Sequence, residues 1–209
     1  MELNKIYKGD ARELLKGLGD KSIDVCLTDF PYGIGENYGE YKDTKENLIE
    51  LVNDIVPELV RVCNVVAFTA PIKHLMIFPQ PKWILCWAIS GAGGMSSWGF
   101  NCWQPILVYG DDPYLKNRMG SRPDLIYLNE TSEKNGHPCP KPITLWRKVL
   151  DRISVKETDI ILDPFIGSGT TAIACMEAKK QWIGFEMEQS YIDIANKRID
   201  LLLSQPKLF

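Results

Sequence analysis

Apolar residues follow two different spacings along this chain, and the two alternate from one end to the other. Continuous apolar runs predict strands near residues 5–8, 23–28, 64–69, 83–88, 104–109, 159–162 and 181–186. Apolar positions at intervals of three and four predict amphipathic helices near residues 10–17, 45–61, 143–152, 169–179 and 190–204. This alternation is typical of βαβ units, which build a mostly parallel sheet with helices on both faces. We therefore expect an α/β fold whose ligands bind beyond the carboxyl ends of the strands.

Neither spacing is clear in the segment 110–142, which is rich in glycine and proline. A loop of this length in a compact domain is usually functional or mobile. With 209 residues, the chain fits a single domain, 1–209, with a short insertion at about 110–136.

Composition narrows the possible partners and compartments. The net charge of −3 argues against a chain coated in basic residues, although it allows a local basic face. Six scattered cysteines without a C-x-x-C pair, together with only two histidines, indicate neither a zinc site nor a disulfide framework. A reducing compartment fits this cysteine usage. No apolar stretch approaches the length of a membrane span, and the N-terminus lacks a signal-peptide pattern.

The stretch DIILDPFIGSGTTAIACMEA, residues 159–178, is the first candidate ligand site. A buried strand ends at Asp163, and Gly167 and Gly169 then form a turn that opens a helix. Glycines allow the backbone to approach a ligand, and the start of a helix offers unpaired amides. The next strand ends in Glu186, whose carboxylate can accept both hydroxyl hydrogens of a ribose. The turn also satisfies G-x-G-x-x-A, so NAD stays open, as does a turn that serves only packing.

The stretch LTDFPYGIG, residues 27–35, is the second candidate. Asp29 ends a strand, and its ionised carboxylate only accepts hydrogen bonds. Pro31 restricts the residue before it, so the carbonyl of Phe30 is held as a second acceptor, and Tyr32 adds an aromatic face. Two acceptors beside a ring match a planar group that carries an NH₂. The alternative is that Asp29 is an ordinary turn or helix-cap residue.

Four motifs resemble those of DNA amino-methyltransferases. Asp29-Phe30-Pro31-Tyr32 resembles their D-P-P-Y motif, and the residues from Asp163 to Thr170 resemble D-P-F-x-G-x-G-T, their motif for S-adenosyl-L-methionine. HPCPKP, residues 137–142, resembles H-P-x-x-K-P, and IYKGD, residues 6–10, resembles the n-G-D start. The order of the motifs resembles that of the β-ordered group of the family, and the resemblance covers residues 3–110 and 137–204.

The resemblance implies a Rossmann-like methyltransferase fold with a seven-stranded, mostly parallel sheet and a circularly permuted motif order. It implies methyl transfer from S-adenosyl-L-methionine to an exocyclic amine of a base flipped out of double-stranded DNA. The catalytic residues would be Asp29, Phe30, Pro31 and Tyr32. The cofactor would contact Asp10, His137, Lys141, Asp163, Phe165, Gly167, Gly169, Thr170 and Glu186. An initial Asp in the first motif favours N6 of adenine, with N4 of cytosine as the alternative.

The sequence departs from the family pattern at two places. Phe30 replaces the first proline of its motif; if only its carbonyl is used, Phe30→Pro should be tolerated. The region left for target recognition, about 110–136, is short, which suggests a short target, a homodimer or help from a partner. Within it, Lys116, Arg118 and Arg122 are candidates for contacts with DNA phosphates, and an ordinary solvated loop is the alternative.

Two further segments have candidate roles. Trp98, Phe100 and Trp103 are expected to pack in the core beside the neighbouring strand, and stacking against a flipped base is the alternative. The last helix is expected to end near Ser204. The tail Gln205–Phe209 resembles the Q-x-x-L-F peptides that dock into bacterial sliding clamps. So short a match favours the alternative, in which the tail folds back onto the core or frays.

Other classes of function stay open at this point. The methyl acceptor is alternatively RNA or a glutamine amide of a protein, since both present a planar NH₂. A non-catalytic subunit that binds cofactor or DNA is a further alternative, although the intact Asp29, Tyr32 and glycine turn argue against it. The resemblance favours a cytoplasmic, prokaryotic or phage-type enzyme of the restriction–modification kind, with no metal and no membrane partner.

Overall fold

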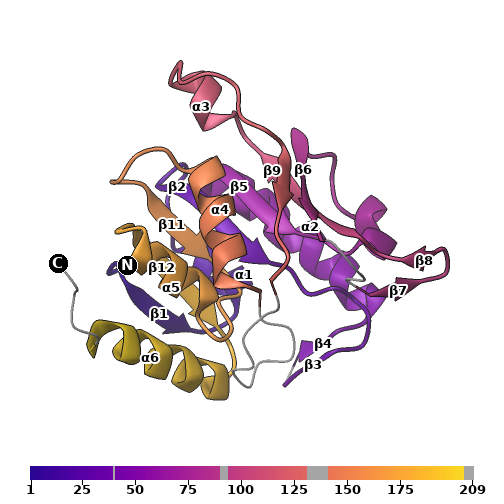
Figure 1. The fold of residues 1–209 in the computed structure, drawn as a ribbon. Coiled ribbons are helices and arrows are strands. Elements are labelled where there is room, and N and C mark those ends of the chain that lie inside the picture. Colours follow the sequence, from indigo (N-terminus) through magenta and orange to yellow (C-terminus); the bar gives the residue numbers. More distant parts are fainter. Residues whose placement is uncertain (40, 90–93, 131–140, 205–209) are drawn as a thin grey trace.

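An eight-stranded sheet forms the centre of the computed structural model, which describes residues 1–39, 41–89, 94–130 and 141–204 (Figure 1). In spatial order the strands are β1 (Lys5–Lys8), β12 (Gln181–Glu186), β11 (Ile160–Asp163), β2 (Ile23–Asp29), β5 (Cys63–Thr69), β9 (Trp103–Tyr109), β6 (Trp83–Ala88) and β10 (Leu125–Tyr127). All of them run in one direction except β9, which is antiparallel to β5 and β6. The parallel strands therefore end at one common edge, which we call the carboxyl edge.

Helices cover both faces of the sheet, so the molecule has three layers (Figure 1). One face is covered by α1 (Ala11–Lys16), α2 (Lys45–Val62) and the 3₁₀ helix η1 (Ile72–Ile77). The other is covered by α4 (Ile143–Ile153), α5 (Thr170–Glu177) and α6 (Gln189–Ser204). A single turn, α3 (Pro113–Lys116), follows β9. Two hairpins stand apart from the main sheet: β3 (Asn37–Tyr38) with β4 (Tyr41–Lys42), and β7 (Met95–Ser96) with β8 (Gly99–Phe100).

The longest helix, α2, shows how the sequence fixes these layers. The Thr44 hydroxyl accepts a hydrogen bond from the Asn47 amide at 3.2 Å, which caps the first turn. Apolar residues then recur at intervals of three and four on one face of the helix: Leu48, Leu51, Val52, Ile55, Val56, Leu59 and Val62. All seven are buried against the sheet. This single apolar stripe determines which side of α2 faces the sheet.

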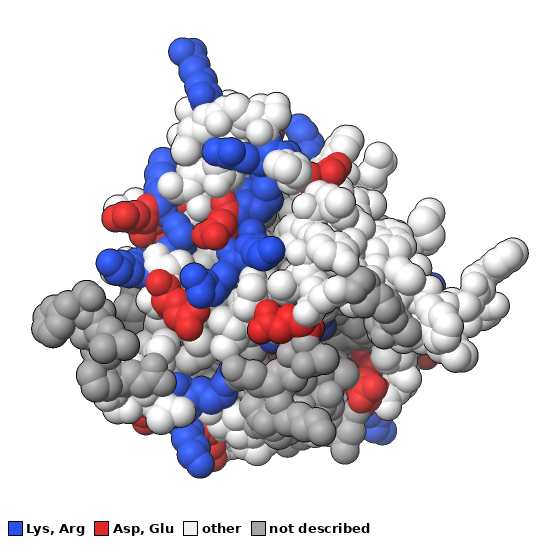
Figure 2. Space-filling model, viewed as in Figure 1, with Lys and Arg blue, Asp and Glu red and all other residues white. Residues whose placement is uncertain are grey.

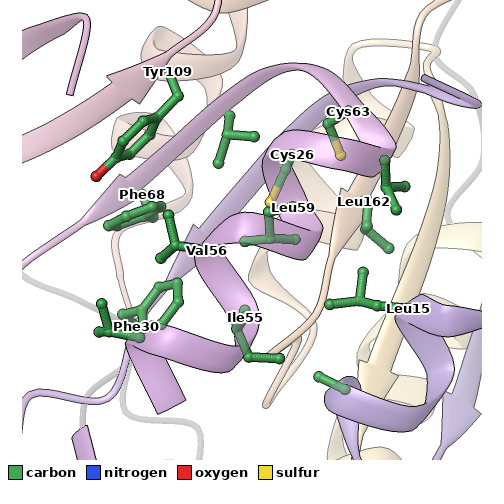
Figure 3. Close-up of a cluster of buried hydrophobic side chains, with 14 of the residues drawn as sticks. Leu15, Cys26, Phe30, Ile55, Val56, Leu59, Cys63, Phe68, Tyr109 and Leu162 are labelled. Atoms are coloured by element: carbon green, nitrogen blue, oxygen red, sulfur yellow. The ribbon is translucent and has the colours of Figure 1, made fainter. Parts of the chain in front are cut away.

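Aromatic rings fill the core beneath the carboxyl edge (Figure 3). Phe30 is only 1% exposed, and its ring centroid lies 4.6 Å from that of Phe68 and 5.7 Å from that of Phe78. It also lies 5.1 Å from the centroid of Phe165, which belongs to the turn after β11. The side chain of Phe30 is therefore part of the core, and its ring joins the two turns that the sequence singled out.

The seven strands and five helices predicted from the sequence are present with boundaries shifted by at most two residues, and α6 ends at Ser204 as predicted. The predicted count of seven strands is wrong, because β10 pairs in parallel with β6 and adds an eighth. With three residues, of which only Ile126 is buried, β10 is too short to give a clear pattern. The proposed insertion at 110–136 thus includes one strand of the main sheet.

Neither a membrane span nor a metal cluster emerges from the described residues. None of their helices is long and apolar enough to cross a bilayer. Within the same residues, His, Cys, Asp and Glu form no group of three or more that could hold a metal ion.

The burial of Phe30 reverses the expectation that Phe30→Pro is tolerated. Removing a buried phenylalanine ring typically lowers the free energy of unfolding by about 3–5 kcal/mol. We expect a loss of that size for Phe30→Pro in urea unfolding, and a smaller one for the control Phe30→Leu, which keeps apolar volume. Equal stability of Phe30→Pro and the parent would contradict the packing described above.

Candidate active site

A cavity of about 470 Å³ opens at the carboxyl edge of the sheet. Its walls include Asp29 at the end of β2, Asp163 at the end of β11 and Glu186 at the end of β12. Parallel pairing of these neighbouring strands brings the three acids to one edge, although they lie far apart in the sequence. The turn from Pro164 to Ser168 and the start of α5 complete this wall.

Hydrogen bonds use both oxygens of Asp29. Oδ1 accepts from the hydroxyl of Tyr32 at 3.0 Å and from the hydroxyl of Thr69, which ends the adjacent strand β5. Oδ2 accepts from Nζ of Lys141 at 2.6 Å. The Lys141 side chain is 9% exposed and that of Asp29 is 23% exposed, so the ion pair is largely shielded from water. Burial alone would lower the pKa of Lys141, but Asp29 and Tyr32 outweigh it and raise this pKa above its usual value.

Tyr32 lies beside the same ion pair. Nζ of Lys141 sits 4.9 Å from the centroid of the Tyr32 ring, and the Tyr32 hydroxyl accepts a hydrogen bond from the Gln104 side chain of β9. Burial, followed by the nearby negative charge of Asp29, raises the pKa of Tyr32 well above its usual value. Tyr32 is therefore a neutral hydroxyl that donates to Asp29.

Asp43 shapes the turn that follows Tyr32. Its carboxylate accepts from the amide of Gly33 at 2.7 Å, that of Ile34 at 3.0 Å and that of Glu36 at 3.2 Å. The Asp43 side chain is buried, so these backbone amides compensate for the loss of water around it. The turn is thus tied to the chain that enters α2.

Asp163 lies at the junction of the two candidate motifs. It is 3% exposed and accepts from the Thr28 hydroxyl at 2.5 Å, the Phe165 amide at 3.0 Å and the Thr171 hydroxyl. Burial is the largest influence on its pKa and, against these donors, raises it to about 6. Since three donors already use its oxygens, Asp163 holds the glycine turn in place and joins it to β2.

Glu186 and the glycine turn form a second unit. One oxygen of Glu186 accepts from the Gly167 amide at 2.9 Å, and the other accepts from the amides of Met187 and Glu188, both at 2.9 Å. Burial is the largest cause of the raised pKa of Glu186, and these amides act against it. A carboxylate oxygen has two acceptor positions, so the oxygen that accepts only from Gly167 has one position left for a hydroxyl group of a ligand.

Gly169 lies where the glycine turn enters α5. Its φ is +84°, in the left-handed region, and a Cβ atom there would lie 2.9 Å from Cβ of Ala195 in α6. Only glycine fits without moving α6. The turn is therefore set by close packing as well as by the Glu186 and Asp163 hydrogen bonds.

Asp10 lines the far wall of the cavity and caps α1. It accepts from the Arg12 amide at 2.8 Å and from Arg12 Nη2 at 2.7 Å. These hydrogen bonds lower the pKa of Asp10, which is therefore ionised.

Lys116, Arg118 and Arg122 lie at the other edge of the sheet. Since β9 runs against β5, Gln104 is near Asp29 and Tyr109 is at the far end of the strand. A seven-residue strand spans roughly 20 Å, and α3 continues beyond Tyr109. Figure 2 shows Lys and Arg side chains gathered over α3 and α4, intermingled with Asp and Glu. This placement does not support phosphate contacts close to Asp29.

The β7–β8 hairpin, in contrast to the charged surface around α3, exposes aromatic side chains. Trp98 is 99% exposed, Phe100 65% and Trp103 39%, so the expectation that these rings pack in the core is wrong. The hairpin leads directly into the start of β9, where Gln104 contacts Tyr32. An apolar projection therefore stands at the carboxyl edge, and its part of Figure 2 is mostly white.

Comparison with known proteins shows similarity to DNA methyltransferases in both sequence and structure. A family model described as DNA methylase matches residues 93–197. The type II methyltransferase M.HpaI of Haemophilus parainfluenzae is 26% identical over 236 aligned residues, covering 94% of this chain and 74% of that protein. The DNA adenine methyltransferase YhdJ of Escherichia coli K12 is 24% identical over 249 aligned residues, covering 96% and 84%. The crystal structure of an M1.HpyAVI–SAM complex superposes with a TM-score of 0.68 at 22% identity, covering 94% of this chain and 98% of that one.

The chain belongs to the DNA methylase family. It is an S-adenosyl-L-methionine-dependent DNA methyltransferase of the kind that acts on adenine N6 or cytosine N4.

Most of the methyltransferase residues predicted from the sequence meet at the cavity. The residues that line it are Asp10, Asp29, Pro31, Lys141, Asp163, Phe165, Gly167, Thr170 and Glu186. Gly169 packs the turn against α6, and the Tyr32 hydroxyl donates to Asp29. His137 and the tail Gln205–Phe209 lie outside the described residues. Lys141, which the resemblance assigned to the cofactor, lines the cavity and contacts Asp29 and Tyr32.

Sequence reasoning missed Thr69, Gln104 and Asp43. Thr69 ends a predicted strand beside the one that ends in Asp29, so an inspection of every strand end would have found it. Gln104 is the second residue of the antiparallel strand β9, whose direction was not predicted. Asp43 acts only through backbone amides, and no sequence pattern marks that role.

Asp163 should make the stability of the methyltransferase depend on pH. Its pKa of about 6 in the folded state exceeds its ordinary value of 3.8, so its contribution is fully present below about pH 4 and is lost as the pH rises through 6. The change across this window is at most about 3 kcal/mol. In urea unfolding, the parent should lose stability relative to Asp163→Asn between pH 4 and pH 6. A difference between the two proteins that is constant over this range would contradict the assignment.

Proposed function

We propose that this methyltransferase acts on N6 of adenine in double-stranded DNA, and that the base leaves the duplex to reach Asp29. The observation that carries the proposal is the position of Asp29: its carboxylate lines the same cavity as the glycine turn and Glu186. Support for adenine comes from the initial Asp of the motif and from the similarity to an adenine methyltransferase. A base inside a duplex cannot reach such a recessed carboxylate, which supports base flipping.

The residues around the cavity fit S-adenosyl-L-methionine. Glu186 keeps one acceptor position for a ribose hydroxyl, and Gly167, which has no side chain, brings backbone close to the cavity. Phe165 and Ile166 form an apolar part of the cavity wall. When bound, this cofactor supplies an electrophilic methyl group on a sulfonium sulfur.

Asp29 orients the acceptor amine. Thr69 and Tyr32 hold Oδ1, so the carboxylate cannot rotate freely, and Oδ2, which accepts from Lys141 in the free enzyme, is the oxygen for a hydrogen of the amine. As the amine nitrogen gains a methyl group, it must lose one proton, and the Asp29 carboxylate is the base beside it. Fixed alignment of acceptor and donor, rather than a metal or a covalent intermediate, supplies most of the acceleration in this proposal.

DNA approaches the carboxyl edge, where the β7–β8 hairpin stands. Proteins that open a duplex often insert apolar side chains between bases. Trp98 and Phe100, both exposed and connected through β9 to the Tyr32 contact, have the chemistry for this role. We assign the hairpin to DNA in place of Lys116, Arg118 and Arg122.

Asp29→Ala should abolish methyl transfer while S-adenosyl-L-methionine still binds, because Asp29 is assigned to the acceptor side. Transfer is measured with labelled cofactor and unmethylated genomic DNA, followed by nucleoside analysis, and binding is measured by calorimetry. N6-methyladenine is the expected product. N4-methylcytosine would correct the base alone, whereas parent-rate transfer by Asp29→Ala would refute the catalytic role.

Replacing Trp98 and Phe100 with alanine should weaken DNA binding roughly tenfold or more, since a stacked aromatic contributes about 1–3 kcal/mol per base. The measurement is an anisotropy titration at several salt concentrations. The comparison variant replaces Lys116, Arg118 and Arg122 with alanine and should bind with nearly the parent affinity and salt dependence. If only the charge variant binds more weakly and with a flatter salt dependence, DNA contacts the other edge.

A further inference from the structure

We propose that Lys141 is an internal substitute for the target amine: its ammonium group occupies the acceptor position of the free enzyme and must leave before a base can enter. The inference rests on the proposed function, because it takes Asp29 as the residue that holds the amine. It adds a residue that regulates access to the acceptor position and makes entry of the base a competition between two nitrogen groups.

The geometry matches that of an acceptor amine in two respects. Nζ of Lys141 donates to Asp29 Oδ2 at 2.6 Å, the oxygen that Thr69 and Tyr32 leave for a substrate. The same atom lies 4.9 Å from the centroid of the Tyr32 ring, where a base that stacks on Tyr32 would have to lie. An ammonium and a base cannot both occupy this space.

The exchange is electrostatically reasonable. Without Lys141, Oδ2 of the partly buried Asp29 carboxylate would lose water and keep no protein donor among the described residues. Lys141 supplies three N–H donors and a full positive charge, which compensates Asp29 in the free enzyme. A neutral amine that replaces it restores the hydrogen bond but not the charge. Entry therefore requires a base that gains enough elsewhere, through stacking and shape, to displace the lysine.

Flexibility of the lysine side chain allows the exchange. Lys141 precedes α4, whose first residue is Ile143, and its long side chain reaches Asp29 from outside β2. Rotation about its side-chain bonds moves the ammonium without moving the helix. Asp29 is held by Thr69 and Tyr32 and stays in place.

The experiment measures base extrusion without cofactor. Once the methylated site is mapped, a duplex carries a fluorescent analogue at the target position, 2-aminopurine for adenine or pyrrolocytosine for cytosine. The increase in fluorescence at saturating enzyme reports the fraction of flipped base. Lys141→Met removes the ammonium and keeps the apolar stem, so it should raise the extrusion equilibrium constant about tenfold. Lys141→Arg keeps a cation and should remain near the parent value.

Two controls separate this role from general effects. Lys148→Met removes one positive charge from the exposed side of nearby α4 and should leave extrusion unchanged. Asp29→Asn removes the charge that holds Lys141, so Lys141→Met should have little further effect in that background. Thermal unfolding of each variant verifies that it is folded.

The outcomes distinguish the inference from the proposed function. Unchanged or reduced extrusion in folded Lys141→Met would overturn the role of Lys141, even if Asp29→Ala is inactive as expected. If Lys141→Met raised base extrusion equally in the Asp29→Asn background, that result would also overturn the role of Lys141, because the effect would not act through the Asp29 charge. An active Asp29→Ala enzyme would instead remove the proposed function on which the inference rests.

Discussion

The active site depends on the contact between the ends of β2 and β11. These strands pair in parallel, and the Thr28 hydroxyl donates to the buried Asp163 carboxylate at 2.5 Å. The rings of Phe30 and Phe165 meet directly beyond that bond, with centroids 5.1 Å apart. One hydrogen bond and one aromatic contact thus fix the turn after Asp29 relative to the glycine turn. Transfer of a methyl group between two bound molecules needs this fixed relation, since a small misplacement of the reacting atoms is costly.

Burial has different consequences for the three acids at the carboxyl edge. Asp163 is enclosed by two hydroxyls and an amide without a cation, and its pKa rises to about 6. Glu186 accepts from three backbone amides and keeps one acceptor position for a ligand. Among the described residues, only Asp29 of these three acids has a cationic partner, Lys141. Backbone amides and hydroxyls hold Asp163 and Glu186, whereas the proposed exchange at Asp29 uses a donor on a long lysine side chain.

The sequence determined most of the fold because each long element has its own apolar pattern. The stripe on α2 and the continuous runs of β2 and β5 leave little choice of face. Short elements were missed because they lack such a pattern. β10 has only three residues, and the β7–β8 hairpin exposes apolar side chains of the kind that normally mark a core. The motif residues around the cavity were predictable from strand ends and the family resemblance. The partners of Asp29 were not, since Thr69, Gln104 and Lys141 come from three separate segments.

Phe30 shows why a departure from a family motif can preserve its chemistry. A proline at this position would restrict the backbone directly, whereas Phe30 anchors it by burying a ring among Phe68, Phe78 and Phe165. The chain therefore exchanges a local restraint for a tertiary one, and Pro31 still restricts the residue before it. A tertiary restraint also couples the Asp29 turn to the glycine turn through Phe165, which a proline ring could not do over the same distance. The rigidity of the Asp29 turn thus depends on the same aromatic core that supports the glycine turn.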